Sequence, residues 1–304
     1  MSQARAQARG DRAAASLEPT VDASIKPGDD FFAYANGGWL KATAIPPGKD
    51  RWGARDEIND VTRARVMQLL DDARSAPAGS IPRKVADFRV ALLNETAIDA
   101  KGLAPLKSYL DSIDRVHDKV GLTRLLGRGM RADVDPLNWG VYRSATLLGL
   151  SVEPSIHGEK TYVAFLVQGG LGLPDRDSYT TTPEPHTPGL RSNYQVYIGR
   201  LLALAGFDHA DRRADAVMVL ETEVAHTHAT REASANDHNA DTVWTQADFA
   251  RKAPGMDWSA FFDAAGLAKQ SAFVPWQPTA VKGVAALVGS VSLETWKDYL
   301  RVRA

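Results

Sequence analysis

The histidines and acidic residues of this sequence could in principle form the zinc site of a peptidase. Such a site is encoded as H-E-x-x-H on a helix, where two imidazoles one turn apart bind zinc and the glutamate activates water. No such string occurs among the 304 residues. His226 and His228 come nearest, but helix positions i and i+2 point about 200° apart and cannot share one ion. We therefore assign no catalytic residue and no metal ligand.

Two weaker metal patterns are also incomplete. His228 and Glu232 stand one helical turn apart, but two ligands do not complete a site, so we interpret them as a solvated or hydrogen-bonded face. His157 and Glu159 match the start of a zinc deaminase motif, which also requires two cysteines. The chain has no cysteine, which excludes that motif, any disulfide and any thiolate nucleophile.

The glycines of the QGGLGLPDRD segment could bind a nucleotide or form a turn. Gly170 and Gly172 follow a predicted strand, but Pro174 stands where a dinucleotide fingerprint continues toward its third glycine. No G-K-S or G-K-T closes a phosphate loop, and Ser151 lies in GLSVE and not in a nucleophile elbow. We predict that these glycines form a tight turn.

The acidic and basic residues at 175–177 follow directly in the same segment. Asp175, Arg176 and Asp177 could form a charged functional cluster. An Asp-Arg-Asp run in a turn is more often a structural corner whose side chains pair with each other. We interpret it in that way.

Composition restricts the class of protein. A content of 44% hydrophobic and 24% charged residues is ordinary for a globular protein, and 304 residues are enough for an enzyme. The net charge of -1, from 36 basic and 37 acidic residues, gives no field that would attract nucleic acid or anionic lipid. No apolar run approaches the roughly 20 residues that cross a bilayer. We expect no nucleic-acid partner and no membrane segment in this chain.

The amino-terminal region divides into a tail and an aromatic-rich segment. Residues 1–24 are rich in Ala, Arg and Gln without apolar periodicity, and we predict a flexible tail. Residues 25–54 contain KPGDDFFAYANGGWLKATAIPPGKDRWG, whose aromatic residues stand among Gly and Pro. This segment is predicted to be irregular and well buried.

Residues 55–304 are dominated by the period of amphipathic helices. One β-rich exception, 139–152 followed by 161–168, predicts a hairpin. The fold class is therefore mainly α, with a small β-hairpin and an irregular aromatic-rich N-terminal segment. Helices are predicted near 55–70, 85–93, 106–113, 122–130, 190–204, 214–228, 258–262, 281–288 and 294–300.

Four segments together resemble a known family. KPGDDFFAYANGGWLKATAIPPGKDRWG, QGGLGLPDRDSY, LETEVAHTHATRE and SLETWKDYLR are similar, in this order, to signature stretches of the neprilysin and endothelin-converting-enzyme family of zinc metallopeptidases, especially its bacterial members. They run from about Lys26 to the end of the chain, and they match only the first part of a typical member. The final TWKDYLRVRA stands within a helical pattern without a C-cap, so we expect the helical domain to be truncated there.

The resemblance implies a two-lobed metalloendopeptidase in which a multi-helix cap lobe encloses a chamber that admits peptides and excludes folded proteins. This chain would supply most of the cap, and residues 25–54 would pack on the absent catalytic lobe. The H-E-x-x-H motif and the zinc belong to that lobe, so the chain should be inactive alone and hold no cofactor. Its expected partners are the C-terminal catalytic part of the same protein and peptide substrates.

The resemblance also implies one substrate-binding pair. Arg51 and Asp56 match family positions at the primed side of the cleft, where the arginine meets a substrate carboxylate. A guanidinium suits that role through bidentate pairing. Asn59 departs from relatives that carry a second arginine there. A structural ion pair at a helix start remains the alternative for Arg51 and Asp56.

Two other functions and two locations stay open at this point. The chain could be a stand-alone peptide- or protein-binding module derived from the cap, or a hydrolase that uses Asp, Glu and His in a cleft that spacing alone does not identify. Many bacterial relatives are exported, so the resemblance implies a periplasmic or otherwise exported protein, with the cytoplasm as the alternative.

Overall fold

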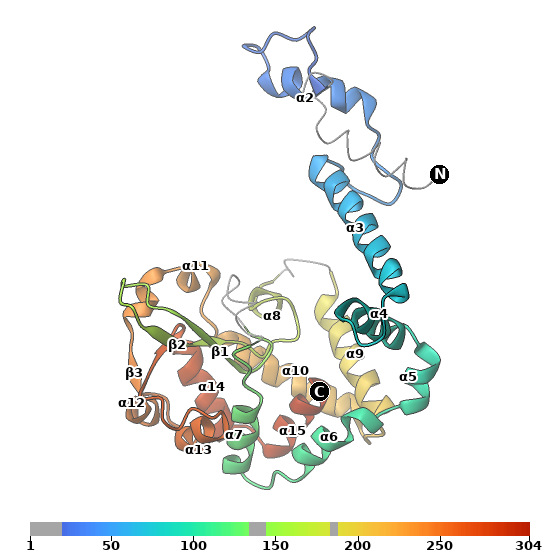
Figure 1. The fold of residues 1–304 in the computed structure, drawn as a ribbon. Helices are drawn as coiled ribbons and strands as arrows, with labels where there is room; N and C mark the ends of the chain where they lie inside the picture. Colours follow the sequence, from blue (N-terminus) through green and yellow to red (C-terminus); the bar gives the residue numbers. More distant parts are fainter. Residues whose placement is uncertain (1–19, 134–143, 183–187) are drawn as a thin grey trace. The chain divides into compact units, whose positions relative to one another are not determined.

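The computed structural model describes residues 20–133, 144–182 and 188–304. It packs as two compact units, one up to Ala100 and the other from Lys101 to Ala304. The division between the units falls at residues 100 and 101. It does not test the boundaries predicted at 24/25 and 54/55, which remain predictions. Figure 1 gives the element labels used below.

The first unit consists of helices, with an irregular connection over 43–53 between the first two of them. Asp30 caps the first described helix by accepting a hydrogen bond from the backbone of Ala33, and Ser80 caps α4 as the sequence predicts, by accepting from Arg83. The expectation of an irregular segment is wrong for the middle of 25–54, which forms a helix despite its two adjacent glycines. The elements are α2 (Phe31–Ala42), α3 (Ala54–Asp72), η3 (Ala73–Ser75), α4 (Ile81–Leu92) and α5 (Glu95–Lys101), whose last residue begins the second unit.

Apolar side chains of the first unit are largely exposed. Phe31 and Phe32 are 69% and 66% exposed, so the prediction that these aromatic residues are well buried is wrong. Helix α3 contains no buried residue, and Phe88 of α4 is exposed as well. The apolar faces that the sequence pattern identified are present, but they bury little surface here and therefore stabilise this unit little.

Asp22 fixes the chain just before α2. Its backbone N–H donates to the Tyr34 carbonyl at 2.7 Å, and its carboxylate accepts from Lys41 Nζ at 2.5 Å. Residues 1–19 of the predicted tail lie outside the described residues. Within the described chain, ordered contacts begin before the predicted tail end at residue 24.

The second unit carries most of the helices, and its longest ones were predicted closely. Helix α9 has the predicted bounds, and α10, α14 and α15 each differ from prediction by a few residues at one or both ends. The helical elements are η4 (Ala104–Leu106), α6 (Lys107–Asp114), α7 (Lys119–Arg128), α8 (Asp177–Thr180), α9 (Leu190–Leu204), α10 (Ala210–Thr227), α11 (Arg231–Ser234), η6 (Asp237–Asp241), α12 (Gln246–Lys252), α13 (Trp258–Ala264), α14 (Pro278–Ser290) and α15 (Leu293–Val302).

The predicted hairpin is confirmed and belongs to a larger sheet. Strands β1 (Leu148–Pro154) and β2 (Tyr162–Gln168) are antiparallel, with Leu148 opposite Gln168. Strand β4 (Ala272–Pro275) pairs parallel to β2 and antiparallel to β3 (Trp244–Thr245), which gives the order β1-β2-β4-β3. Residues 139–143 of the predicted first strand lie outside the described residues.

The core of the second unit joins the sheet to the helices. Phe249 contacts the rings of Trp258, Phe262 and Phe273, and Phe262 stacks on Phe273 with ring centroids 4.4 Å apart. The sheet and α12 to α14 gather on one side of this unit, whereas α6 and α9 occupy the other (Figure 1). The fold is thus mainly α with a small β element, as predicted. No helix among the described residues is long and apolar enough to span a membrane.

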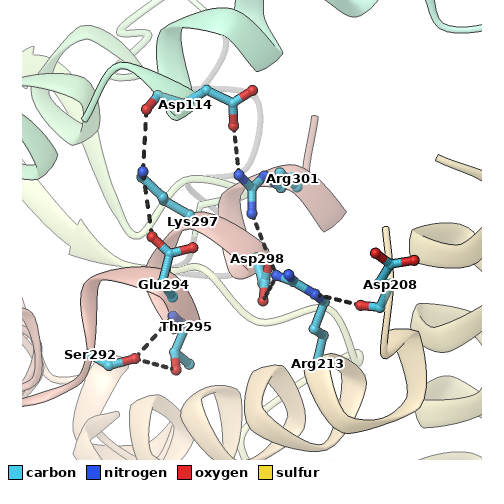
Figure 2. A network of polar contacts seen from close by, with 9 residues as sticks. All are labelled: Asp114, Asp208, Arg213, Ser292, Glu294, Thr295, Lys297, Asp298 and Arg301. Carbon is cyan, nitrogen blue, oxygen red and sulfur yellow. Dashed lines mark hydrogen bonds and ion pairs between the residues drawn. The ribbon is translucent and has the colours of Figure 1, made fainter. Parts of the chain in front are cut away.

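An ionic network centred on the buried Asp298 and Arg301 joins α15 to its neighbours (Figure 2). Arg213 of α10 places Nη1 2.8 and 2.9 Å from the two carboxylate oxygens of Asp298. Arg301 donates to Asp298 at 2.8 Å and, through its other terminal nitrogen, to Asp114 of α6 at 2.6 Å. Its guanidinium also lies 4.6 Å from the centre of the Phe207 ring. The last helix is therefore held by charge as well as by apolar packing.

Replacing Asp298 tests how much this network contributes. The substitution D298N leaves the buried Arg301 with less compensation, and we expect a loss of about 3 kcal/mol in the free energy of unfolding. Urea unfolding followed by circular dichroism measures it. D114N is the control, because the Asp114 carboxylate is 56% exposed and should contribute less than about 1 kcal/mol. Equal losses in the two variants would contradict the account.

Candidate functional site

Hydrogen bonds from several elements hold the turn after β2 in place. Gln168, at the end of β2, accepts from the Ala229 backbone N–H at 2.8 Å and donates to the Ala229 carbonyl at 3.3 Å. Its own N–H donates to Gln277 Oε1 at 2.9 Å. These buried bonds fix the strand end against the segment that follows α10.

The glycines lie in a turn, as the sequence predicted, and close contacts that the sequence did not predict require them there. Gly170 has φ of +85°, and its carbonyl accepts from the Tyr299 hydroxyl at 2.8 Å. A Cβ on Gly172 would lie 1.8 Å from the hydroxyl of Tyr194. Since a side chain at either position would be strained or collide, the glycines allow the backbone to approach the tyrosines.

Glu221 of α10 accepts hydrogen bonds from the turn and from the tyrosines around it. Its carboxylate accepts from the Gly172 N–H and from the Tyr194 hydroxyl, each at 3.1 Å, and from the Tyr179 hydroxyl. A terminal nitrogen of Arg303 lies 3.7 Å away. Burial raises the pKa of Glu221, while the hydrogen bonds from Tyr179 and the charge of Arg303 act in the opposite direction.

The surrounding tyrosines act as hydrogen-bond donors at any ordinary pH. Burial, together with the Glu221 charge, raises the pKa of Tyr179 and of Tyr194 well above the usual value. The Tyr179 hydroxyl also accepts from the backbone N–H groups of Gly172 and Leu173 at 3.1 and 2.8 Å. This arrangement holds the turn in place and does not resemble an acid–base pair poised for proton transfer.

The Asp-Arg-Asp run forms a corner, as predicted. Asp175 Oδ1 accepts from the backbone N–H and the hydroxyl of Ser178 at 2.8 and 2.7 Å. Arg176 Nη1 pairs with the adjacent Asp177 at 3.1 Å. The run therefore starts α8 and contributes side chains to a cleft. That cleft, of about 540 Å³, is lined by residues within 168–177 and by residues within 228–235.

The histidines considered for a metal have other surroundings. His228 is buried at the end of α10 with Nε2 3.1 Å from the Gly169 carbonyl, and His226 lies 3.9 Å from Glu223. Glu232 belongs to α11, so it does not continue the helix of His228. Within residues 20–133, 144–182 and 188–304, no group of three or more His, Asp or Glu could hold a metal ion. The described residues thus do not fit a zinc site, and no step through zinc is derived from them.

Arg51 and Asp56 lie at the start of α3 in the first unit. Asp56 stands in the first turn of the helix, its N–H donating to the Gly53 carbonyl at 2.9 Å. Arg51 is exposed and precedes the helix, and the two side chains make no hydrogen bond or ion pair with each other. Their role toward substrate remains a prediction.

Sequence reasoning missed Glu221, Tyr179, Tyr194 and Arg303 as a group. Glu221 carried a detectable signal, since an acidic residue falls among Val217, Leu220 and Val224 on the buried face of a predicted helix. Its partners come from three other parts of the chain, and their spacing in the sequence gives no sign of the contact.

Comparison with known proteins identifies the class to which this fold and turn belong. Residues 27–304 match the amino-terminal domain model of Peptidase family M13. Human endothelin-converting enzyme-like 1 is 32% identical over 217 residues, which cover 70% of this chain and 28% of that protein. Endothelin-converting enzyme 1 of Rattus norvegicus is 28% identical over 254 residues, covering 82% of this chain and 32% of that protein.

Solved structures with a similar fold agree with this family match. The inhibitor complex of the Mycobacterium tuberculosis zinc metalloprotease Zmp1 has a TM-score of 0.73 at 26% identity, over 93% of this chain and 42% of that one. PepO from Lactobacillus rhamnosis, with a TM-score of 0.62 at 14% identity, shares the fold. The chain belongs to peptidase family M13, and it spans less than half the length of these relatives.

The pH dependence of stability tests the environment of Glu221. A raised folded-state pKa means that Glu221 favours folding below the ordinary value of 4.5, and that this contribution is lost as pH rises through the folded pKa. E221Q cannot ionise. The free energy of unfolding of the natural protein, minus that of E221Q, should therefore fall in urea titrations as the pH is raised above 4.5. A difference that grows with pH would contradict this prediction. It would show that Arg303 and the tyrosines lower the pKa of Glu221 by more than burial raises it.

Proposed function

We propose that this chain is the N-terminal cap portion of a neprilysin-like zinc metalloendopeptidase, which encloses the substrate chamber and limits the size of peptides that enter. The match of residues 27–304 to the amino-terminal family domain carries this proposal. The described residues offer no metal-binding group, so the zinc and the hydrolytic chemistry would come from the rest of the protein. Alone, the chain would be inactive.

The exposed apolar residues of the first unit support the proposal that a partner covers this part of the chain. Phe31, Phe32 and the apolar side chains of α3 and α4 lie open to solvent, which is costly for a protein that works alone. We propose that the C-terminal catalytic part of the same protein covers them, with residues 25–54 in the contact. The near-neutral charge of the chain gives no support for a nucleic-acid partner.

Peptides are the proposed substrates, and Arg51 with Asp56 the proposed substrate contacts. Arg51 is exposed and not paired with Asp56, so its guanidinium can meet a carboxylate. The proposed location is the periplasm or another exported compartment, by analogy with bacterial relatives of the family. The rival function is a stand-alone peptide- or protein-binding module, favoured by the extensive core of residues 101–304.

Hydrolysis of a quenched fluorescent peptide library separates the two functions. The purified chain alone should cleave nothing, with or without added zinc. Mixing with the catalytic part should give cleavage that a chelator abolishes. Cleavage by this chain alone would overturn the proposal, and a catalytic part that is fully active on large and small substrates without this chain would favour the binding module.

Substitution of Arg51 tests the substrate contact. In the reassembled enzyme, R51Q should raise KM for peptides with a free C-terminal carboxylate by about tenfold, because one charge-assisted hydrogen-bonding group is lost. Amidated peptides should be affected little. R55Q is the matched control, since Arg55 is also exposed and lies one residue before Asp56. An equal effect of R51Q on free and amidated peptides would contradict the assignment.

A further inference from the structure

The cleft beside the turn after β2 has the size of a binding site. It measures about 540 Å³, and volumes of roughly 300–1,000 Å³ are usual for ligand pockets. A second hollow of about 250 Å³ adjoins it, since Leu171, Pro174 and His228 line both. The two hollows are thus neighbours at the turn, and both are lined by its residues.

The acidic side chains of the cleft are already engaged. Asp175 accepts two hydrogen bonds from Ser178, and Asp177 is paired with Arg176. Hydrogen bonds from its own backbone amide and from Thr230 lower the pKa of Glu232. These carboxylates therefore have little remaining capacity to bind a cation.

The arginines of the cleft retain hydrogen-bonding capacity. Arg176 uses Nη1 on Asp177, but its Nε is buried and has no hydrogen-bond partner among the described residues. Buried donors are rarely left without an acceptor, so such an atom calls for one. Arg231, which also lines the cleft, is exposed and makes no hydrogen bond or ion pair with another side chain of the described residues. The Nε of Arg176 and the guanidinium of Arg231 thus remain available to an acceptor in the cleft.

We propose that this cleft binds a carboxylate group of a peptide through Arg176 and Arg231. The proposal rests on the function proposed above and specifies that the peptide substrates carry a carboxylate that this cleft recognises. A guanidinium pairs with a carboxylate through two parallel hydrogen bonds, and one such fork uses Nε. The proposal requires the Arg176 side chain to turn its Nε toward the cleft that this residue lines. Leu171 and Pro174 provide apolar contact for the neighbouring peptide residues.

Three labelled hexapeptides of the same sequence test the proposal by fluorescence anisotropy with the 304-residue chain. One has a free C-terminal carboxylate, one is amidated, and one is amidated with a single internal glutamate. Both carboxylate probes should bind at least about tenfold more tightly than the neutral probe. Their advantage should shrink when salt is raised, because the charges are partly exposed.

Arginine variants identify the groups responsible. R176Q and R231Q should each remove most of the tenfold preference, and R176K should not restore it, because a lysine lacks the fork. R212Q, an exposed arginine of α10 outside the cleft, should keep the preference. R176Q loses only the solvent-exposed pair with Asp177 and an Nε donor without a partner, so its urea midpoint should change little from that of the natural chain. R231Q provides an independent test on the other wall.

Equal affinity for all three probes, or a preference that survives in both R176Q and R231Q, would overturn the proposal. A second source of carboxylate is the catalytic part itself. If R176Q weakens association with that part while no probe binds the chain, the cleft is a docking site for the catalytic part and the peptide proposal is wrong. Because the binding assay needs no catalytic part, failure to reconstitute hydrolysis would leave its result intact.

Discussion

The buried carboxyl group of Glu221 is the interaction on which the turn after β2 depends. It lies on α10 and receives hydrogen bonds from Gly172 in the turn, from Tyr179 on α8 and from Tyr194 on α9. Arg303, at the end of the chain, approaches it as well. A single side chain therefore joins elements from across the second unit, and the position of the cleft beside the turn follows from it. Without these partners, burying a carboxyl group would cost several kcal/mol.

Features encoded by local chemistry could be predicted from the sequence. Helix α9 was predicted to its bounds, and the Ser80 cap, the hairpin and the Asp175–Asp177 corner all follow from residue types and short spacings. The turn at Gly170 was likewise predicted, because only glycine adopts its backbone conformation without strain. The family itself was recognised from four ordered segments, and the match over residues 27–304 agrees with it.

Features that depend on distant contacts could not be predicted. Strand β3 has two residues and is defined by its pairing with β4, which has no counterpart in a periodicity pattern. The segment Phe31–Ala42 is helical although glycine disfavours a helix, with Asp30 and its cap hydrogen bond setting the start. The exposure of its aromatic residues could not be predicted for a different reason. An apolar pattern indicates that side chains will be buried, but it does not show whether the same chain or another molecule buries them.

The two units of this chain thus differ in self-sufficiency: one has an extensive core, and the other leaves apolar helices exposed. The proposed catalytic part would explain this difference by covering the first unit in the working enzyme. Hydrogen exchange measured by mass spectrometry, on the chain alone and with that part at saturating concentration, tests this most directly. We predict strong protection of amides in α2 to α4 on mixing. Unchanged exchange in these helices would contradict the claim that this chain is the cap of an M13 peptidase.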